Sequence, residues 1–276
     1  MGLDFTTAGF KYLALLLFLG SLACTEIPPV IGGPDSSGQT GEQRVLVEEF
    51  TGVYCVNCPG GSAFLQQLQE VYGDRLVIVS IHSGFFARQY PESQHQFKTD
   101  ETEALQNLLG TPVAYPSATV NRTVFSGQNS RILGQADWAS SIQLSADQEP
   151  QIALDLETGL ASNGQVTINV QMAGLVQIDY PLFLSVLLTE DNITDPQNTL
   201  SGVELNYTHH HVLRKILTPV SGESLVSSLS IGQRLSKSYQ YTIPDNWNPD
   251  QVHAVALVHR NDGQLDVLNV VEKKVK

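Results

Sequence analysis

Basic side chains are scarce in this sequence. Its 276 residues contain 15 Lys and Arg against 28 Asp and Glu, which gives a net charge of -13 at pH 7. Binding of nucleic acid needs basic side chains that displace counterions from the phosphates, so we expect no nucleic-acid partner. The composition, 42% apolar and 16% charged, is that of a globular protein and excludes a disordered, collagen-like or coiled-coil chain.

The N-terminal apolar run is too short to cross a membrane. It reads YLALLLFL at residues 12–19, whereas a membrane-spanning helix needs about 20 residues. Lys11 precedes the run and the small residues GSLA follow it, which predicts a secretory signal peptide over residues 1–23. Small residues before a cysteine resemble a bacterial lipoprotein signal, so we expect Cys24 to be lipidated as the first residue of the mature chain. A plain signal peptide, with Cys24 left free, is the alternative.

The segment after Cys24 has too few apolar residues to pack a core. It reads TEIPPVIGGPDSSGQTGEQ, rich in Pro, Gly and Ser, which is typical of a flexible linker. Residues 24–43 are therefore predicted to be a lipidated tether that holds the folded body near a membrane.

Cysteines are few, and two of the three lie close together. Cys55 and Cys58 follow a strand-like run at residues 44–50 and precede an amphipathic helix that ends at Gly73; another strand-like run follows at residues 75–81. Strand, Cys-x-x-Cys, helix and strand in this order indicate a thioredoxin-like redox motif. Half of a zinc site is the alternative, but no second ligand pair has suitable spacing, so we expect neither metal nor cofactor.

The spacing of the two cysteines suits thiol-disulfide exchange. If Cys55 lies at a helix start, free backbone N–H groups and the helix dipole favour its thiolate, which attacks a disulfide. Cys58, one turn further on, then resolves the mixed disulfide. The partners would be thiols or disulfides of other envelope proteins.

Two further segments resemble thioredoxins. Glu49 stands six residues before Cys55, where thioredoxins keep a buried acid, and the segment Tyr115-Pro116-Ser117 resembles their cis-proline segment. The resemblance implies that Glu49 accepts a proton from Cys58 and that Pro116 shapes a substrate groove. A solvated Glu49 and a trans turn at Pro116 are the alternatives.

Other candidate residues lie near the motif or carry imidazole groups. Tyr54 precedes Cys55, and His82 closes the second strand at the edge that carries the dithiol, so both are candidates for tuning the thiolate. For His82 a hydrogen-bonded structural role is favoured over tuning. The aromatic insertion SGFFARQYPESQHQFKTD at residues 83–100 could line a binding face or close the edge of the fold. The adjacent histidines 209–211 would alternate faces on a strand, which disfavours a shared metal ion.

The second half of the chain changes to a period of two. Apolar residues alternate at 152–156, 166–172 and 239–243, and turn signals separate the runs. This pattern predicts an all-β, Ig-like sandwich of about seven strands. The expected fold class is therefore an α/β thioredoxin-like domain at residues 44–148 followed by a β-sandwich domain at residues 149–276.

The sequence resembles a family named for a 28-kilodalton outer-membrane protein, surface lipoproteins typical of Bacteroidetes. The segments that carry the resemblance are EEFTGVYCVNCPG, IHSG, YPSATVNR, HHHVLRKILTP and HAVALVHRNDGQLDVLNVV. It implies an outer-membrane location in the cell envelope, facing either the periplasm or the outside, and a thioredoxin-like domain joined to a β-sandwich.

Two functions follow from these patterns. The leading hypothesis is a lipid-anchored envelope thiol-disulfide oxidoreductase that acts through Cys55, Cys58 and Pro116. The alternative is a non-enzymatic surface binding lipoprotein in which Cys55 and Cys58 form a structural disulfide, since a fold does not dictate an activity.

Overall fold

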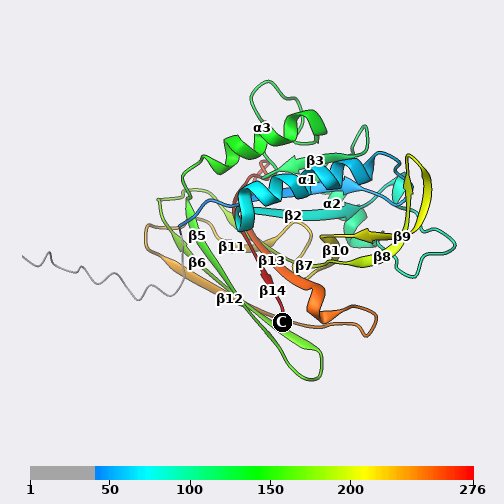
Figure 1. The fold of residues 1–276 in the computed structure, drawn as a ribbon. Coiled ribbons are helices and arrows are strands. Elements are labelled where there is room, and N and C mark those ends of the chain that lie inside the picture. The colour runs from blue at the N-terminus through cyan, green and yellow to red at the C-terminus, as the bar shows by residue number, and fades with distance from the viewer. Residues whose placement is uncertain (1–40) are drawn as a thin grey trace, which may run out of the picture. The chain divides into compact units, whose positions relative to one another are not determined.

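The computed structural model describes residues 41–276, which form mostly β-structure (Figure 1). They contain fourteen strands and three α-helices. The predicted signal peptide, the lipidated Cys24 and nearly all of the tether lie outside the described residues.

The first half of the described chain is built around two central strands. Strand β1 (Val45–Thr51) and strand β2 (Leu76–His82) pair in parallel, and helix α1 (Cys58–Tyr72) connects them. Every residue of both strands is buried, as expected for strands that are covered on both faces. The helix ends at Gly73, whose φ of 57° suits glycine, and this confirms the predicted end. A short 3-10 turn, Gly73–Arg75, leads into β2.

Helices cover both faces of this part of the sheet. The other edge of β1 pairs antiparallel with β3 (Ser117–Val120), which pairs with β4 (Leu133–Gly134). Helices α1 and α3 (Gln135–Ala146) pack on one face, where Leu65 and Trp138 join the apolar cluster. Helix α2 (Asp100–Leu109) packs on the opposite face through Leu105 and Leu109.

The second half contributes two packed layers of strands. One is a three-stranded antiparallel sheet of β5 (Ile152–Leu160), β6 (Gln165–Gly174) and β12 (Arg234–Thr242). The other contains β7 (Leu182–Glu190), β10 (Val212–Ile216), β11 (Glu223–Val226), β13 (Val252–His259) and β14 (Val267–Lys274). The alternating apolar residues of β6 all point into the core between the layers, which confirms the predicted period of two.

One mixed sheet joins the two halves. Strand β10 pairs antiparallel with β7 and, at Val212, in parallel with Ser80 of β2. The strand order is therefore β14-β13-β7-β10-β2-β1-β3-β4, with β11 beside β7. Of the ten strands after residue 149, eight form the two layers, near the predicted number of about seven, and β8 and β9 form a separate hairpin. The boundary near Pro150 stays a prediction.

A separate hairpin lies beside the Cys-x-x-Cys turn. Strands β8 (Ile193–Thr199) and β9 (Gly202–His209) form a two-stranded sheet. The backbone N–H of Asn198 donates to the carbonyl oxygen of Val53 at 2.7 Å, which ties β8 to this turn. Two further 3-10 turns occur at Phe85–Ala87 and Pro249–Gln251.

Candidate functional site

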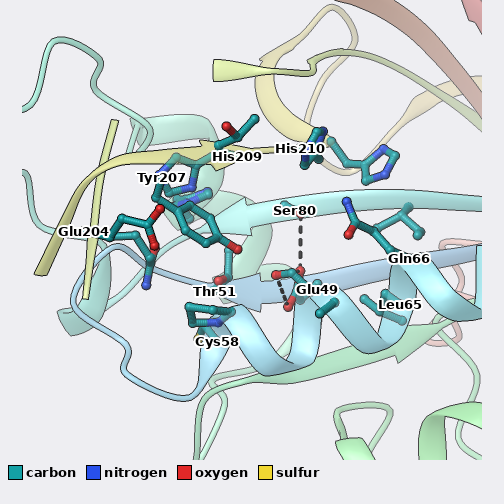
Figure 2. Close-up of a pocket in the computed structure, with 18 of the residues that line it drawn as sticks. Glu49, Thr51, Cys58, Leu65, Gln66, Ser80, Glu204, Tyr207, His209 and His210 are labelled. Atoms are coloured by element: carbon teal, nitrogen blue, oxygen red, sulfur yellow. Dashed lines mark hydrogen bonds between the residues drawn. The ribbon is translucent and has the colours of Figure 1, made fainter. Parts of the chain in front are cut away.

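Glu49 is a buried acid in the middle of β1. The hydroxyl of Ser80 on β2 donates to a carboxyl oxygen of Glu49 at 3.3 Å (Figure 2), and the hydroxyl of Ser62 on α1 donates to both carboxyl oxygens at 3.0 and 3.1 Å. Burial raises the pKa of Glu49 to about 7, although both hydroxyl donors act to lower it. The buried acid is confirmed, whereas proton transfer between Glu49 and Cys58 stays a prediction.

Its neighbour Glu48 lies against a different partner. Glu48 accepts two hydrogen bonds from Arg122 and one from the hydroxyl of Thr119, all of them buried. Alternation along β1 thus places one carboxyl in an ion pair and the other beside the Cys-x-x-Cys helix. No pattern in the sequence indicates this ion pair.

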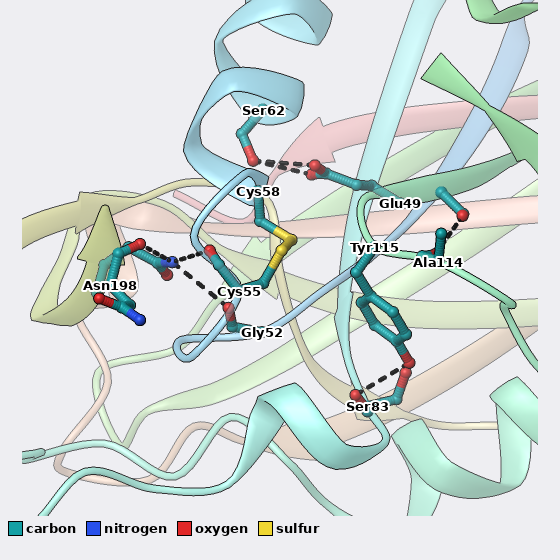
Figure 3. Close-up of a disulfide and its surroundings, with 11 residues drawn as sticks. Glu49, Gly52, Cys55, Cys58, Ser62, Ser83, Ala114, Tyr115 and Asn198 are labelled. Carbon is teal, nitrogen blue, oxygen red and sulfur yellow. Dashed lines mark hydrogen bonds between the residues drawn. A yellow bond between two sulfur atoms is a disulfide. The ribbon is translucent and has the colours of Figure 1, made fainter. Parts of the chain in front are cut away.

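Cys55 and Cys58 form a disulfide at the start of α1 (Figure 3). The helix begins at Cys58 rather than at Cys55, because Pro59 occupies its first turn, where proline is favoured. Cys55 instead lies in the preceding turn, where its N–H donates to the carbonyl oxygen of Gly52. The expectation that Cys55 itself starts the helix is therefore wrong.

The disulfide is almost fully covered. Cys55 is 3% exposed and Cys58 is 1% exposed. From β8, the side-chain amide of Gln197 donates to the carbonyl oxygens of Cys55 and Gly52 at 3.0 and 3.4 Å. A partner therefore has little access to the sulfur atoms in this structure.

The aromatic insertion packs against the same turn. The N–H of Tyr54 donates to the carbonyl oxygen of Phe86 at 2.9 Å, and the rings of Tyr54 and Tyr90 stack at 3.9 Å. The guanidinium of Arg88 lies 4.0 Å from the centre of the Tyr54 ring. Tyr54 is thus held by the insertion, although Phe85 remains 70% exposed.

Pro116 lies close to the first turns of α1. The Tyr115–Pro116 peptide bond is cis, which confirms that prediction. A Cβ added to Gly61 would come within 2.7 Å of the Pro116 ring, so helix and loop are in close contact here. The role of Pro116 in a substrate groove stays a prediction.

A cavity of about 310 Å³ borders Cys58 between α1, β2 and β9. Glu49 and His82 both line it, so the structure brings together three of the candidate residues. Burial lowers the pKa of His82 well below its ordinary value, helped by His209, and its Nδ1 has no hydrogen-bond partner. The predicted tuning of the thiolate by His82 stays untested.

The three adjacent histidines have different surroundings. Burial lowers the pKa of His209 to about 4, and its Nε2 lies 3.3 Å from the carbonyl oxygen of Asp195. His211 Nδ1 lies 3.6 Å from a carboxyl oxygen of Asp191. Across residues 41–276, no group of three or more His, Cys, Asp or Glu side chains is arranged to hold a metal ion.

The β8–β9 hairpin supplies site residues that were not predicted from the sequence. Glu204 and Tyr207 of β9 line the cavity, and Gln197 of β8 donates a hydrogen bond to the carbonyl oxygen of Cys55. They lie more than 140 residues after Cys55 in the chain, as the separation of 142 between Gln197 and Cys55 shows. No local pattern marks them, because their position depends on tertiary contacts alone.

Comparison with solved structures finds similar folds at low sequence identity. HBP35 of Porphyromonas gingivalis is 19% identical, with a TM-score of 0.67. The matched region covers 86% of this chain and 76% of the HBP35 chain. A protein from Agrobacterium tumefaciens is 14% identical with a TM-score of 0.50, over 86% of this chain and 96% of its own. A domain of the outer membrane lipoprotein Omp28 of P. gingivalis is 16% identical with a TM-score of 0.33, over 47% and 91% of the chains.

The family assignment comes from the sequence itself. No curated protein matches the chain. The model of the family described as outer membrane protein Omp28 matches residues 103–276, which include three of the five segments noted above but not the cysteine pair. Within the described residues, no helix is long and apolar enough to span a membrane. The chain belongs to the Omp28 family, and it is an outer-membrane protein of the cell envelope.

Proposed function

We propose that the protein is a non-enzymatic binding lipoprotein of the outer membrane, in which Cys55 and Cys58 form a structural disulfide. The observation that carries this proposal is the near-complete burial of both cysteines in a closed disulfide. Thiol-disulfide exchange requires that the attacking thiolate reaches a sulfur atom of the disulfide.

The contacts around the disulfide support a structural role. The turn that it closes accepts hydrogen bonds from Gln197 and Asn198 of β8, and Tyr54 packs on the aromatic insertion. A crosslink that closes so short a loop stabilises the fold by about 2 kcal/mol in the chain-entropy account. The disulfide thus holds the surface on which the hairpin of the second half rests.

Trapping in the native envelope tests this proposal. The full chain with Cys58→Ser keeps a free Cys55 thiol, and a catalytic thiol would accumulate mixed disulfides with envelope proteins because the resolving step is lost. We expect no trapped partner. We also expect iodoacetamide to label Cys55 and Cys58 slowly and at equal rates in the reduced wild-type protein, as measured by peptide mass spectrometry. Rapid labelling of Cys55 alone together with a trapped partner would contradict the proposal.

A second candidate is a thiol-disulfide oxidoreductase. The specific observation in its favour is Glu49, a buried acid with a pKa of about 7 that lines the same cavity as Cys58. The order β1, Cys-x-x-Cys, α1 and β2, with Pro116 against α1, is thioredoxin-like. On this proposal Cys55 attacks and Cys58 resolves once the sulfur atoms are exposed.

A further inference from the structure

The outer edge of β9 is a free strand edge. Strand β8 occupies one side of β9, and in the part of the chain that the structure describes no strand pairs with the other side. Val203 and Leu205 of β9 are 48% and 54% exposed. A free edge offers unpaired N–H and C=O groups, to which an extended segment can add as a new strand.

This edge borders the cavity beside Cys58. Residues 206–209 at the end of β9 line the cavity together with Ser62 and Gln66 of α1, and Figure 2 shows Tyr207, His209 and Gln66 there. Neighbouring residues of a strand point to opposite faces, so a run of consecutive lining residues means that the edge itself faces the cavity. The volume of the cavity, about 310 Å³, lies at the lower end of the range of roughly 300 to 1,000 Å³ for ligand pockets.

Two carboxyl groups line the cavity, and the one with the raised pKa of about 7, Glu49, takes its negative charge more readily when a cation lies beside it. Glu49 lines the cavity from β1 and Glu204 from β9, and none of its described lining residues is a lysine or arginine. Burial lowers the pKa values of His82 and His209, so neither imidazole supplies a positive charge near neutral pH. A basic side chain is therefore the complementary occupant.

We propose that the free edge of β9 binds an extended segment of another envelope protein as an added strand, and that a lysine or arginine of this segment enters the cavity toward Glu49. This inference rests on the proposed binding function and names the chemistry of its partner. Backbone hydrogen bonds along β9 supply affinity, and the acidic cavity selects the basic side chain.

Three peptides test the proposal on the full-length protein. Each is about nine residues long, within the usual length of a strand, and alternates valine with threonine. The first has a central lysine, the second a central glutamate, and the third has the lysine sequence with N-methyl groups on alternate backbone nitrogens. Fluorescence anisotropy measures affinity, and hydrogen exchange followed by NMR measures the protection of the β9 amides.

We expect the lysine peptide to bind and to slow exchange of the β9 amides. The glutamate peptide should bind at least about tenfold more weakly, and the N-methylated peptide should protect no β9 amide. Unchanged exchange in β9 at saturating lysine peptide, or equal affinity for the N-methylated peptide, would overturn the proposal.

Matched variants locate the charge preference. Glu204→Gln and Glu49→Gln should each weaken binding of the lysine peptide several-fold, whereas Glu157→Gln, an exposed carboxyl on β5, should leave it unchanged. Glu204 is exposed, so its variant keeps the test valid even if Glu49→Gln fails to fold. Equal affinities in all three variants would overturn the role of the cavity. Trapped mixed disulfides would contradict the structural disulfide without affecting the β9 result, so the two proposals fail separately.

Discussion

Arg122 and Glu48 form a two-point ion pair inside the protein. Arg122 Nη2 lies 2.6 Å from Glu48 Oε1 and Arg122 Nε lies 2.9 Å from Oε2, with both side chains 1% exposed or less. The pair joins the central strand β1 to the residues that follow β3. Removal of one partner would leave the other charge buried without compensation.

Arg122→Met should therefore destabilise the protein by about 3 to 5 kcal/mol, measured by urea unfolding. The double variant Glu48→Gln/Arg122→Met should lose less, because no charge is then left unpaired. Arg260→Gln is the matched control: Arg260 also makes a two-point contact, with Asp262, but at the surface, so its loss should cost at most about 1 kcal/mol. Equal losses at Arg122 and Arg260 would show that burial of the ion pair has no energetic consequence.

Glu49 should make the free energy of unfolding depend on pH. Its pKa is raised from 4.5 to about 7, so the folded protein holds this proton more tightly than the unfolded chain does. Stability from this group is present below pH 4.5 and is lost as the pH rises through about 7, a change on the order of 3 kcal/mol. Glu49→Gln cannot undergo this change and should gain stability relative to wild type toward pH 8.

The comparison with wild type is needed because buried histidines act in the opposite direction. The pKa values of His209 and His259 are lowered to about 4 and about 3, so these groups reduce stability as the pH falls below 6.5. They remain in Glu49→Gln and cancel in the difference between the two unfolding curves. A difference that does not vary between pH 4.5 and pH 8 would mean that Glu49 is not held in its neutral form.

The lipid anchor is predicted at Cys24. Mass spectrometry of the native protein should find a mature chain that begins at a lipidated Cys24, and Cys24→Ser should move the protein from the membrane fraction to the soluble fraction. The double variant Cys55→Ser/Cys58→Ser is the control for loss of cysteine and should stay with the membrane. An unmodified Cys24 in the native chain would remove the anchor.

The predicted domain boundary can be tested with the fragment of residues 44–148. We expect a dispersed proton NMR spectrum, but a lower free energy of unfolding than that of the whole chain. The reason is that Phe50 and Leu105 share one apolar cluster with Leu187 of β7 and Leu257 of β13, which the fragment lacks. A collapsed, undispersed spectrum would mean that the second half completes the core.

Several predictions that the structure confirms came from local sequence patterns or from resemblance to known segments. The period of two in β6 and the end of α1 at Gly73 each depend on a few neighbouring residues. The burial of Glu49 followed from the resemblance of its position to that of the buried acid in thioredoxins. A cis bond before Pro116 followed from its resemblance to a known segment, and the structure has that bond.

The remaining features depend on residues far apart in the chain. Arg122 follows its partner Glu48 by 74 residues, and Gln197 follows Cys55 by 142. No local sequence pattern indicates either pair, since a buried carboxylate could accept hydrogen bonds from any arginine in the chain. The parallel contact of Ser80 with Val212, which joins the two halves, is likewise invisible in the periodicity of either strand.

The central position of β1 has a mechanical consequence. The chain enters the folded body directly through this strand, which pairs with β2 along one edge and with β3 along the other. A pull along β1 from its N-terminal side must shear both rows of hydrogen bonds at once, instead of opening them one after another. A force applied to the folded body at residue 41 therefore acts on an inner strand of the sheet. An edge strand such as β14 can separate from the sheet without freeing β1 from its two neighbours.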